Sequence, residues 1–329
     1  METGVAYFDS RASRHYLPDL DDMVASGCSY VVHCLSEFDV LWSKESMRRL
    51  VAETRARGMA AWIDPWGVGE VFGGEPYSRF GALHPEARQV RSDGVPTTTA
   101  CLNQPAFRAF VRDWIDVSAD IGGDTVFWDE PTSYLRDGTW GCRCELCRSL
   151  WRERMGGHMP TVYTGEVQAF LEETMRDLLG ESCLFARSLG LRNAICIMPP
   201  EAGNPGFRDW DRAASIPGLD NFGTDPYWYS FKGDAAEYVG RYARRTVETA
   251  ERHGLDHHVW IQGFEVPAGR EDEIRVAIAA AVDAGATNLA LWSYAGCEAM
   301  STCECDRPQE VWRVASDSFR RLRGGAGSR

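Results

Sequence analysis

The stretch 29–63, SYVVHCLSEFDVLWSKESMRRLVAETRARGMAAWI, contains a complete unit of strand, helix and strand. Its two ends, Ser29–Cys34 and Ala60–Ile63, are short and mostly apolar. Between them, Trp42–Arg57 has the pattern of an amphipathic helix, with a candidate N-terminal cap at Ser43 and a stop signal at Gly58. Two apolar strands joined through a helix predict neighbouring parallel strands that the helix covers.

The same alternation continues along the chain and predicts one (β/α)8-barrel domain over residues 1–329, a length that one barrel with insertions can fill. An open doubly wound sheet is the alternative, but it would need a GxGxxG phosphate loop after an early strand, and that motif is absent there. The eight predicted strands are Val5–Phe8, Ser29–Cys34, Ala60–Ile63, Thr125–Trp128, Ala194–Met198, Asn221–Gly223, Val259–Gln262 and Leu289–Trp292. The predicted helices are Leu17–Ala25, Trp42–Arg57, Ala106–Ile121, Gly165–Leu189, Asp209–Ser215, Ala235–His253, Glu271–Ala284 and Gln309–Arg323.

Two connections are unusually long. They follow predicted strands three and four and cover residues 64–105 and 129–163. Both run from a strand to a helix, which is the side where barrels place their chemistry. We therefore expect these two loops to shape a substrate cleft.

The overall composition excludes several classes of function. Hydrophobic residues make up 44% and charged residues 25%, as in globular proteins. A net charge of −13 without a Lys/Arg-rich run argues against a nucleic-acid partner. No signal peptide and no spanning stretch of about 18 apolar residues is visible, so we expect a cytoplasmic protein without a membrane role.

Two glutamates follow predicted strands. Strand four ends in TVFWDEP, with Asp129 and Glu130, and strand seven ends in VWIQGFEVP, with Glu265. Glycoside hydrolysis needs two carboxyl groups that flank the scissile bond. One is held protonated as the acid, and the other is ionised as nucleophile or base.

A Glu after strand four and another after strand seven resembles the clan A glycoside hydrolases. The resemblance implies that Glu130 is the acid/base, that Glu265 is the nucleophile and that the anomeric configuration is retained. Trp292, at the end of strand eight, matches the position of a sugar-stacking Trp in that clan. Two features depart from the pattern: Asp129 replaces the usual Asn, and no Arg follows strand two, where the sequence is HCLSEFD. Since an ionised Asp can only accept hydrogen bonds, the substrate or the mechanism can differ.

Three of the eleven cysteines form a C-x-C-x2-C motif, TWGCRCELC, at Cys142, Cys144 and Cys147. Thiolates at this spacing converge easily on one zinc ion, and Cys101 is the best candidate for a fourth ligand. The combination resembles the zinc motif of family 42 β-galactosidase-type hydrolases, which implies a structural zinc held by Cys101, Cys142, Cys144 and Cys147. Reduced thiols without metal are the alternative. A second cluster, Cys297, Cys303 and Cys305, could supply a substitute ligand or a disulfide.

Acidic and aromatic residues gather at the predicted strand ends, as expected for a carbohydrate site in which flat rings stack on sugars and carboxylates accept hydroxyl hydrogen bonds. Three histidines, His33, His257 and His258, are expected to be structural. The predicted substrate-binding residues are Asp9, Asp64, Trp66, Trp128, Asp129, Glu201, Asp225, Tyr227, Trp228 and Trp292.

The main alternative is a carbohydrate-binding barrel without turnover. The presence of Asp129 in place of the clan's usual Asn leaves this alternative open. A barrel aldolase or phosphate-handling enzyme would need a strand-end Lys or a Gly-rich phosphate site. No Lys stands at a strand end, and the loop after strand eight is acidic, with Glu298 and Glu304. We therefore predict a hydrolase that acts on a small glycoside or oligosaccharide and needs no organic cofactor.

Overall fold

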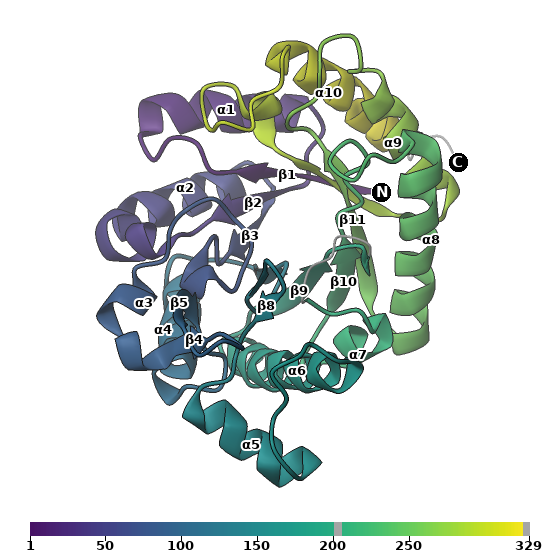
Figure 1. Ribbon diagram of the computed structural model, residues 1–329. Coiled ribbons are helices and arrows are strands. Elements are labelled where there is room, and N and C mark those ends of the chain that lie inside the picture. Colours follow the sequence, from purple (N-terminus) through teal and green to yellow (C-terminus); the bar gives the residue numbers. More distant parts are fainter. Residues whose placement is uncertain (201–205, 325–329) are drawn as a thin grey trace.

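The computed structural model describes residues 1–200 and 206–324. Eight parallel strands close into a barrel in the order β1-β12-β11-β10-β9-β6-β3-β2, seen end-on in Figure 1. Each strand overlaps its predicted range, so the predicted (β/α)8 barrel is confirmed. The barrel strands are β1 (Glu2–Tyr7), β2 (Tyr30–Cys34), β3 (Ala60–Asp64), β6 (Thr125–Asp129), β9 (Arg192–Ile197), β10 (Asn221–Thr224), β11 (Asp256–Gln262) and β12 (Asn288–Trp292).

Helices surround the barrel (Figure 1). The start and end of α8 show how local sequence sets their bounds: Oδ1 of Asp234 accepts the N–H groups of Ala236 and Glu237, and Gly254 ends the helix at φ 66°. The surrounding helices are α1 (Ser13–Ala25), α2 (Lys44–Ala56), α4 (Pro105–Asp120), α6 (Gly165–Ser188), α7 (Trp210–Ala214), α8 (Ala235–His253), α9 (Glu273–Asp283) and α10 (Pro308–Gly324).

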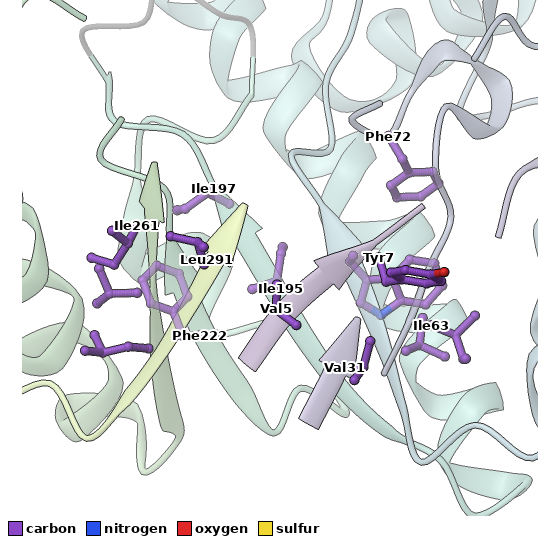
Figure 2. Packing of buried hydrophobic residues seen from close by; sticks show 14 of the residues in the cluster. Val5, Tyr7, Val31, Ile63, Phe72, Ile195, Ile197, Phe222, Ile261 and Leu291 are labelled. Atoms are coloured by element: carbon purple, nitrogen blue, oxygen red, sulfur yellow. The ribbon is translucent and has the colours of Figure 1, made fainter. Parts of the chain in front are cut away.

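Side chains along each strand alternate between the helices and the barrel interior. Figure 2 shows Val5, Val31, Ile63, Ile195 and Leu291 among the buried residues that pack in the layer between strands and helices. The residues next to them on the strands point inward and form a separate cluster. This alternation decides which strand-end residues can reach the mouth of the barrel.

The barrel interior is filled mainly by aromatic rings. The ring centroids of Tyr30 and Trp62 lie 4.4 Å apart, those of Phe127 and Trp260 5.3 Å, and those of Trp260 and Trp292 5.5 Å. Packed rings therefore fill the interior from the bottom of the barrel to its mouth, and the barrel is not a channel.

Two inward-facing glycines make room for these large rings. A Cβ on Gly4 would overlap the ring of Tyr30, and one on Gly223 would overlap the imidazole of His258. A larger residue at either position would force the packed rings apart.

The two long loops contain short elements of their own, which the sequence did not predict. The backbone N–H of Ser92 donates to the Trp140 carbonyl at 2.7 Å, and that of Arg143 donates to the Val90 carbonyl at 2.7 Å. The two loops are thus joined to each other by main-chain hydrogen bonds. Their strands and helices are α3 (Phe80–Leu83), β4 (Arg88–Val90), β5 (Pro96–Ala100), β7 (Leu135–Arg136), β8 (Thr139–Trp140) and α5 (Glu145–Met155). Short 3-10 or π turns cover Asp39–Ser43, Val68–Glu70, Pro85–Ala87 and Tyr294–Cys297.

Candidate active site

Both glutamates singled out in the sequence stand at the carboxyl end of the barrel. Glu130 follows β6, and its backbone N–H donates to the Cys196 carbonyl at 3.0 Å. Glu265 lies beyond β11, and its N–H donates to the Cys303 carbonyl at 2.8 Å. Strands β9 and β10 separate β6 from β11 around the barrel.

The backbone at both glutamates is in the left-handed region, with φ 38° at Glu130 and φ 50° at Glu265. This conformation is uncommon for a residue with a Cβ and is found often at functional sites. Glu130 is partly buried, whereas Glu265 is exposed. A pocket beside Glu130 is lined by Pro131, Thr132, Ile197, Met198, Pro199, Pro200, Gly206, Phe207 and Arg208.

Three buried aspartates from three strand ends share this mouth: Asp64, Asp129 and Asp225. Burial, reinforced by the charges of Glu75 and Glu130, raises the pKa of Asp64 well above its usual value. Burial also raises the pKa of Asp129, together with the charges of Asp64, Glu130 and Glu75. The shifts favour neutral carboxylic acids, which can donate a hydrogen bond.

Asp225 lies next to Glu130. Burial comes first among the causes that raise the pKa of Asp225, followed by the charge of Glu130. Tyr227 completes this side of the mouth, because the charges of Asp225, Asp129 and Glu130 act on its hydroxyl and, after burial, raise its pKa.

Aromatic rings form the other part of the mouth. The ring of Phe8 stacks on Trp66 with a centroid distance of 5.1 Å and on Trp292 with one of 5.8 Å. Trp66 is partly exposed, and its indole N–H has no hydrogen-bond partner among the described residues. The two tryptophans predicted to contact sugar are therefore placed together, with Phe8 between them.

The structure places two other predicted tryptophans outside the mouth. Trp128 is fully buried between barrel and helices and donates its N–H to Oδ1 of Asn193 at 3.2 Å. Trp228 is also buried, and its N–H donates to Glu273 at 2.9 Å. Trp128 precedes inward-facing Asp129 on its strand and therefore points outward, and Trp228 lies beyond β10 with its ring buried, so neither ring lies at the mouth in this structure.

Asp9 is influenced by other charges than the three buried aspartates are. The residue before it, Phe8, points into the barrel. The charges acting on Asp9 come from Asp19, His15 and Arg11, on the α1 side. Asp9 is therefore apart from the group formed by Asp64, Asp129 and Asp225, and its part in substrate binding stays a prediction. Glu201 lies outside the described residues.

Sequence reasoning missed two acids in or behind the first long loop. Glu75 is exposed and acts on Asp64, Asp129 and Cys303. Glu37 is buried and accepts hydrogen bonds from the N–H groups of Gly69, Arg79 and Phe80 and from the Ser78 hydroxyl. It thereby anchors the loop that carries Glu75. No local pattern marks either residue, since both roles arise from loop conformation.

The histidines are structural, as predicted. His33 is buried, its Nε2 lies 2.9 Å from the Thr54 hydroxyl, and burial lowers its pKa to about 3. His258 is likewise buried, with its pKa lowered to about 3, and His257 Nε2 accepts the backbone N–H of Thr287.

The four predicted metal ligands come together. Cys101, Cys142, Cys144 and Cys147 are buried, and their sulfur atoms all lie within 4.8 Å of one another. The Sγ of Cys101 is 3.8 Å from that of Cys144 and 3.5 Å from that of Cys147. Four sulfurs at about 2.3 Å from a tetrahedral zinc would be about 3.8 Å apart. The quartet is therefore close enough to bind one metal ion.

The surroundings of the quartet suit thiolates. The Cys144 N–H donates to Cys142 Sγ at 3.4 Å, and the Asn103 amide donates to Cys147 Sγ at 3.3 Å. Hydrogen bonds from Cys101, Cys142 and Cys147 lower the pKa of Cys144, whereas hydrogen bonds within the quartet, together with burial, raise the pKa of Cys101. Because Cys101 belongs to the first long loop and the others to the second, a metal here would tie the two loops together.

The second cysteine cluster takes neither role considered from the sequence. All eleven cysteines are free thiols, so Cys297, Cys303 and Cys305 form no disulfide. Among the described residues, only the first quartet brings three or more possible ligands together. Cys305 Sγ accepts the Val266 N–H at 3.5 Å, which supports the backbone next to Glu265.

A larger hollow, of about 260 Å³, lies away from these groups on the flank between α4 and α6. It contains the ion pair of Arg108 with Glu181 and the stacked side chains of Arg112 and Phe185. It has none of the convergent carboxyl groups found at the strand ends, so we place the candidate site at the barrel mouth.

The fold and the strand-end site define the class of the chain as a (β/α)8 barrel. The same fold supports many chemistries, with the active site built from the loops at this end. No known protein family and no curated protein matches the sequence.

Solved structures with the same fold include sugar-acting enzymes. The endo-β-1,4-mannanase of Thermotoga petrophila aligns with a TM-score of 0.62 at 11% identity, over 100% of this chain and 78% of the other. The mannanase of Rhizomucor miehei gives 0.61 at 11% identity, over 97% and 95%. D-psicose 3-epimerase of Clostridium cellulolyticum H10 gives 0.53 at 10%, over 98% and 99%. At these identities the likeness shows the fold alone. No described helix is both long and apolar enough to span a membrane.

Proposed function

We propose that the protein is a retaining glycoside hydrolase acting on a small glycoside or oligosaccharide, with Glu130 as acid/base and Glu265 as nucleophile. The observation that carries the proposal is the pair itself: Glu130 follows β6 and Glu265 lies three residues beyond β11, both with left-handed backbone, at the end of the barrel that also holds the stacked rings of Phe8, Trp66 and Trp292. The likeness of the fold to mannanases supports it.

In this mechanism Glu265 attacks the anomeric carbon while Glu130 protonates the leaving oxygen, and Glu130 then activates water to hydrolyse the glycosyl ester. Asp225 lies beside Glu130, whose charge raises the pKa of Asp225. Retention requires the two carboxyl groups to stand about 5–5.5 Å apart in the working enzyme. Trp66 and Trp292 supply faces on which a sugar can stack.

The metal in this proposal is a structural zinc on Cys101, Cys142, Cys144 and Cys147. Four thiolates leave no open coordination position, so the ion would stabilise the loops and take no part in the reaction. A cytoplasmic location stays a prediction, which the absence of disulfides among the eleven cysteines supports.

The test is hydrolysis of a panel of aryl glycosides that differ in sugar and anomer, with wild-type protein and Glu265→Ala. We expect turnover of at least one member, its loss in Glu265→Ala and partial recovery with added azide, which can attack the face left open. Glu304→Ala changes an exposed acid on the neighbouring loop and serves as the control, with activity retained and no azide effect. Binding of sugars without turnover of any glycoside would instead identify a non-catalytic carbohydrate-binding barrel.

A further inference from the structure

A second hollow, beside α5, gathers positive charge in an otherwise acidic protein. Figure 1 shows α5 at the edge of the molecule, away from the barrel axis. The chain has 48 Asp and Glu against 35 Lys and Arg, and the α5 hollow reverses that balance. Its volume is about 320 Å³, near the lower end of the roughly 300–1,000 Å³ of small-molecule sites. The hollow is lined by Arg143, Glu145, Arg148, Arg152, His158 and Met159.

The three arginines of the α5 hollow have no acidic partner. In the part of the chain that the structure describes, none of them forms an ion pair with a carboxylate. Arg152 donates instead to the Ser149 hydroxyl at 3.1 Å. On the same helix, but outside the hollow, Arg154 pairs with Asp177 at 2.9 Å. The protein itself therefore leaves the positive charge of the hollow uncompensated.

The one acid of the hollow, Glu145, does not neutralise it. Glu145 stands three residues before Arg148 on α5, a spacing at which an ion pair often forms on a helix. Glu45 and Arg48 form such a pair at 2.7 Å, whereas no ion pair joins Glu145 to Arg148. One carboxylate also leaves an excess of positive charge beside three guanidinium groups.

The arginines approach the hollow from two walls. Arg148 and Arg152 are four residues apart on α5 and so lie on one side of the helix. Arg143 precedes the helix, and its side chain donates to the carbonyls of Ser92 at 3.2 Å and Met159 at 3.0 Å. These bonds hold Arg143 in place. Arg148 and Arg152 are exposed, and most of their N–H donors have no acceptor among the described residues, so a ligand can reach them.

These donors favour an anion of a particular shape. A guanidinium group has five N–H donors and no acceptor, and its planar fork matches the oxygens of a carboxylate or a phosphate. A carboxylate has two oxygens in one plane, which one fork can occupy. A tetrahedral oxyanion has further oxygens that can accept from guanidinium groups on more than one side. A long polyanion such as nucleic acid is disfavoured by the net charge of −13.

We propose that the α5 hollow binds a tetrahedral oxyanion, a phosphate or sulfate group, between Arg148 and Arg152 on one wall and Arg143 on the other. The group is either the free ion or an ester on a small molecule such as a sugar. The hollow contains neither Glu130 nor Glu265, so the inference does not rest on the proposed hydrolysis.

The test is calorimetric titration of the wild-type protein at constant ionic strength with inorganic phosphate, inorganic sulfate, glucose 6-phosphate and glucose 6-sulfate. We expect saturable binding of at least one of the four at one site per chain, and no binding of glucose. Arg148→Gln should weaken that binding by about tenfold or more, because hydrogen bonds between charged groups are lost. Arg154→Gln removes the same charge from the same helix outside the hollow and should bind like wild type. Tighter binding of the esters would identify a small-molecule site, and equal binding a site for the free ion.

The inference is wrong if none of the four anions binds, if acetate binds as tightly as they do, or if Arg154→Gln loses as much affinity as Arg148→Gln. Glu145→Gln provides a second test of opposite sign. It removes the negative charge of the hollow and should tighten binding by about twofold or more, as for exposed charges, so weaker or unchanged binding would contradict the assignment. Both substituted positions in the hollow are exposed, so these variants should fold, and thermal unfolding without ligand checks that they do.

Discussion

The α-carbon of Gly73 lies against the carboxyl group of Asp129, and the Gly73 N–H donates to the Asp129 carbonyl at 3.0 Å. A Cβ at position 73 would overlap Oδ2 of Asp129. The first long loop thus closes on the end of β6 at the residue that precedes Glu130. Only a glycine permits this approach, so the loop and the candidate acid are held in a fixed relationship.

Gly73→Ala should therefore displace either the loop or the Asp129 side chain. We expect kcat/KM to fall by about 10–100-fold, since a shift of about 1 Å near reacting groups can cost that much, while the fold is retained. Gly165→Ala is the matched control, because a Cβ there has no neighbour within 4 Å. Equal activity of the two variants would show that the contact with Gly73 has no role in catalysis.

Asp129→Asn tests which member of the acid pair donates the proton. If Asp129 only positions a substrate group, the variant should stay within about tenfold of wild type. Glu130→Gln should lose about 10²–10⁴-fold, and most with poor leaving groups, which depend on protonation. An inactive Asp129→Asn beside an active Glu130→Gln would reverse the assignment.

Asp64→Asn should stabilise the protein, and more so at higher pH. Burial raises the pKa of Asp64 above its ordinary value of 3.8, so the folded state binds the proton more tightly than the unfolded state. The stability that this proton contributes is complete below pH 3.8 and is lost as the pH rises through the folded-state pKa. Asn has no such loss.

Urea unfolding at several pH values measures the effect. The free energy of unfolding of Asp64→Asn minus that of wild type should grow as pH rises from about 4, to about 1–3 kcal/mol, the cost of an unsatisfied buried group. Asp283→Asn, at an exposed position, should show a flat difference. A difference for Asp64→Asn that shrinks with rising pH would mean that Asp64 has a cationic partner in the folded protein.

Metal analysis tests the cysteine quartet. We expect one zinc per chain, lost in Cys147→Ser together with roughly 5 °C or more of Tm, because a few kcal/mol of loop stabilisation disappears. Cys303→Ser, a thiol outside the quartet, should keep its zinc. Protein without zinc in which all four thiols titrate freely would show that the quartet is a group of reduced cysteines.

The sequence by itself determined the number and the position of the barrel strands. Each strand is a short apolar run between helical segments, and this pattern is local, so Ala60–Ile63 or Leu289–Trp292 can be located without knowing what packs on them. The cysteine quartet could also be predicted from the sequence, because the short C-x-C-x2-C spacing brings three of its thiols close together.

Only the tertiary structure decided which residues meet at the mouth. Asp129 and Trp128 are neighbours in sequence, yet Asp129 faces the barrel interior and Trp128 faces the helices. Where the strand ends decides which of the two residues reaches the mouth. Glu75 acts on Asp64 and Asp129 because Glu37 and Gly73 shape the loop between them. The raised pKa values of the buried aspartates are likewise a property of the assembled site, because charge and burial depend on every strand and loop that closes around it.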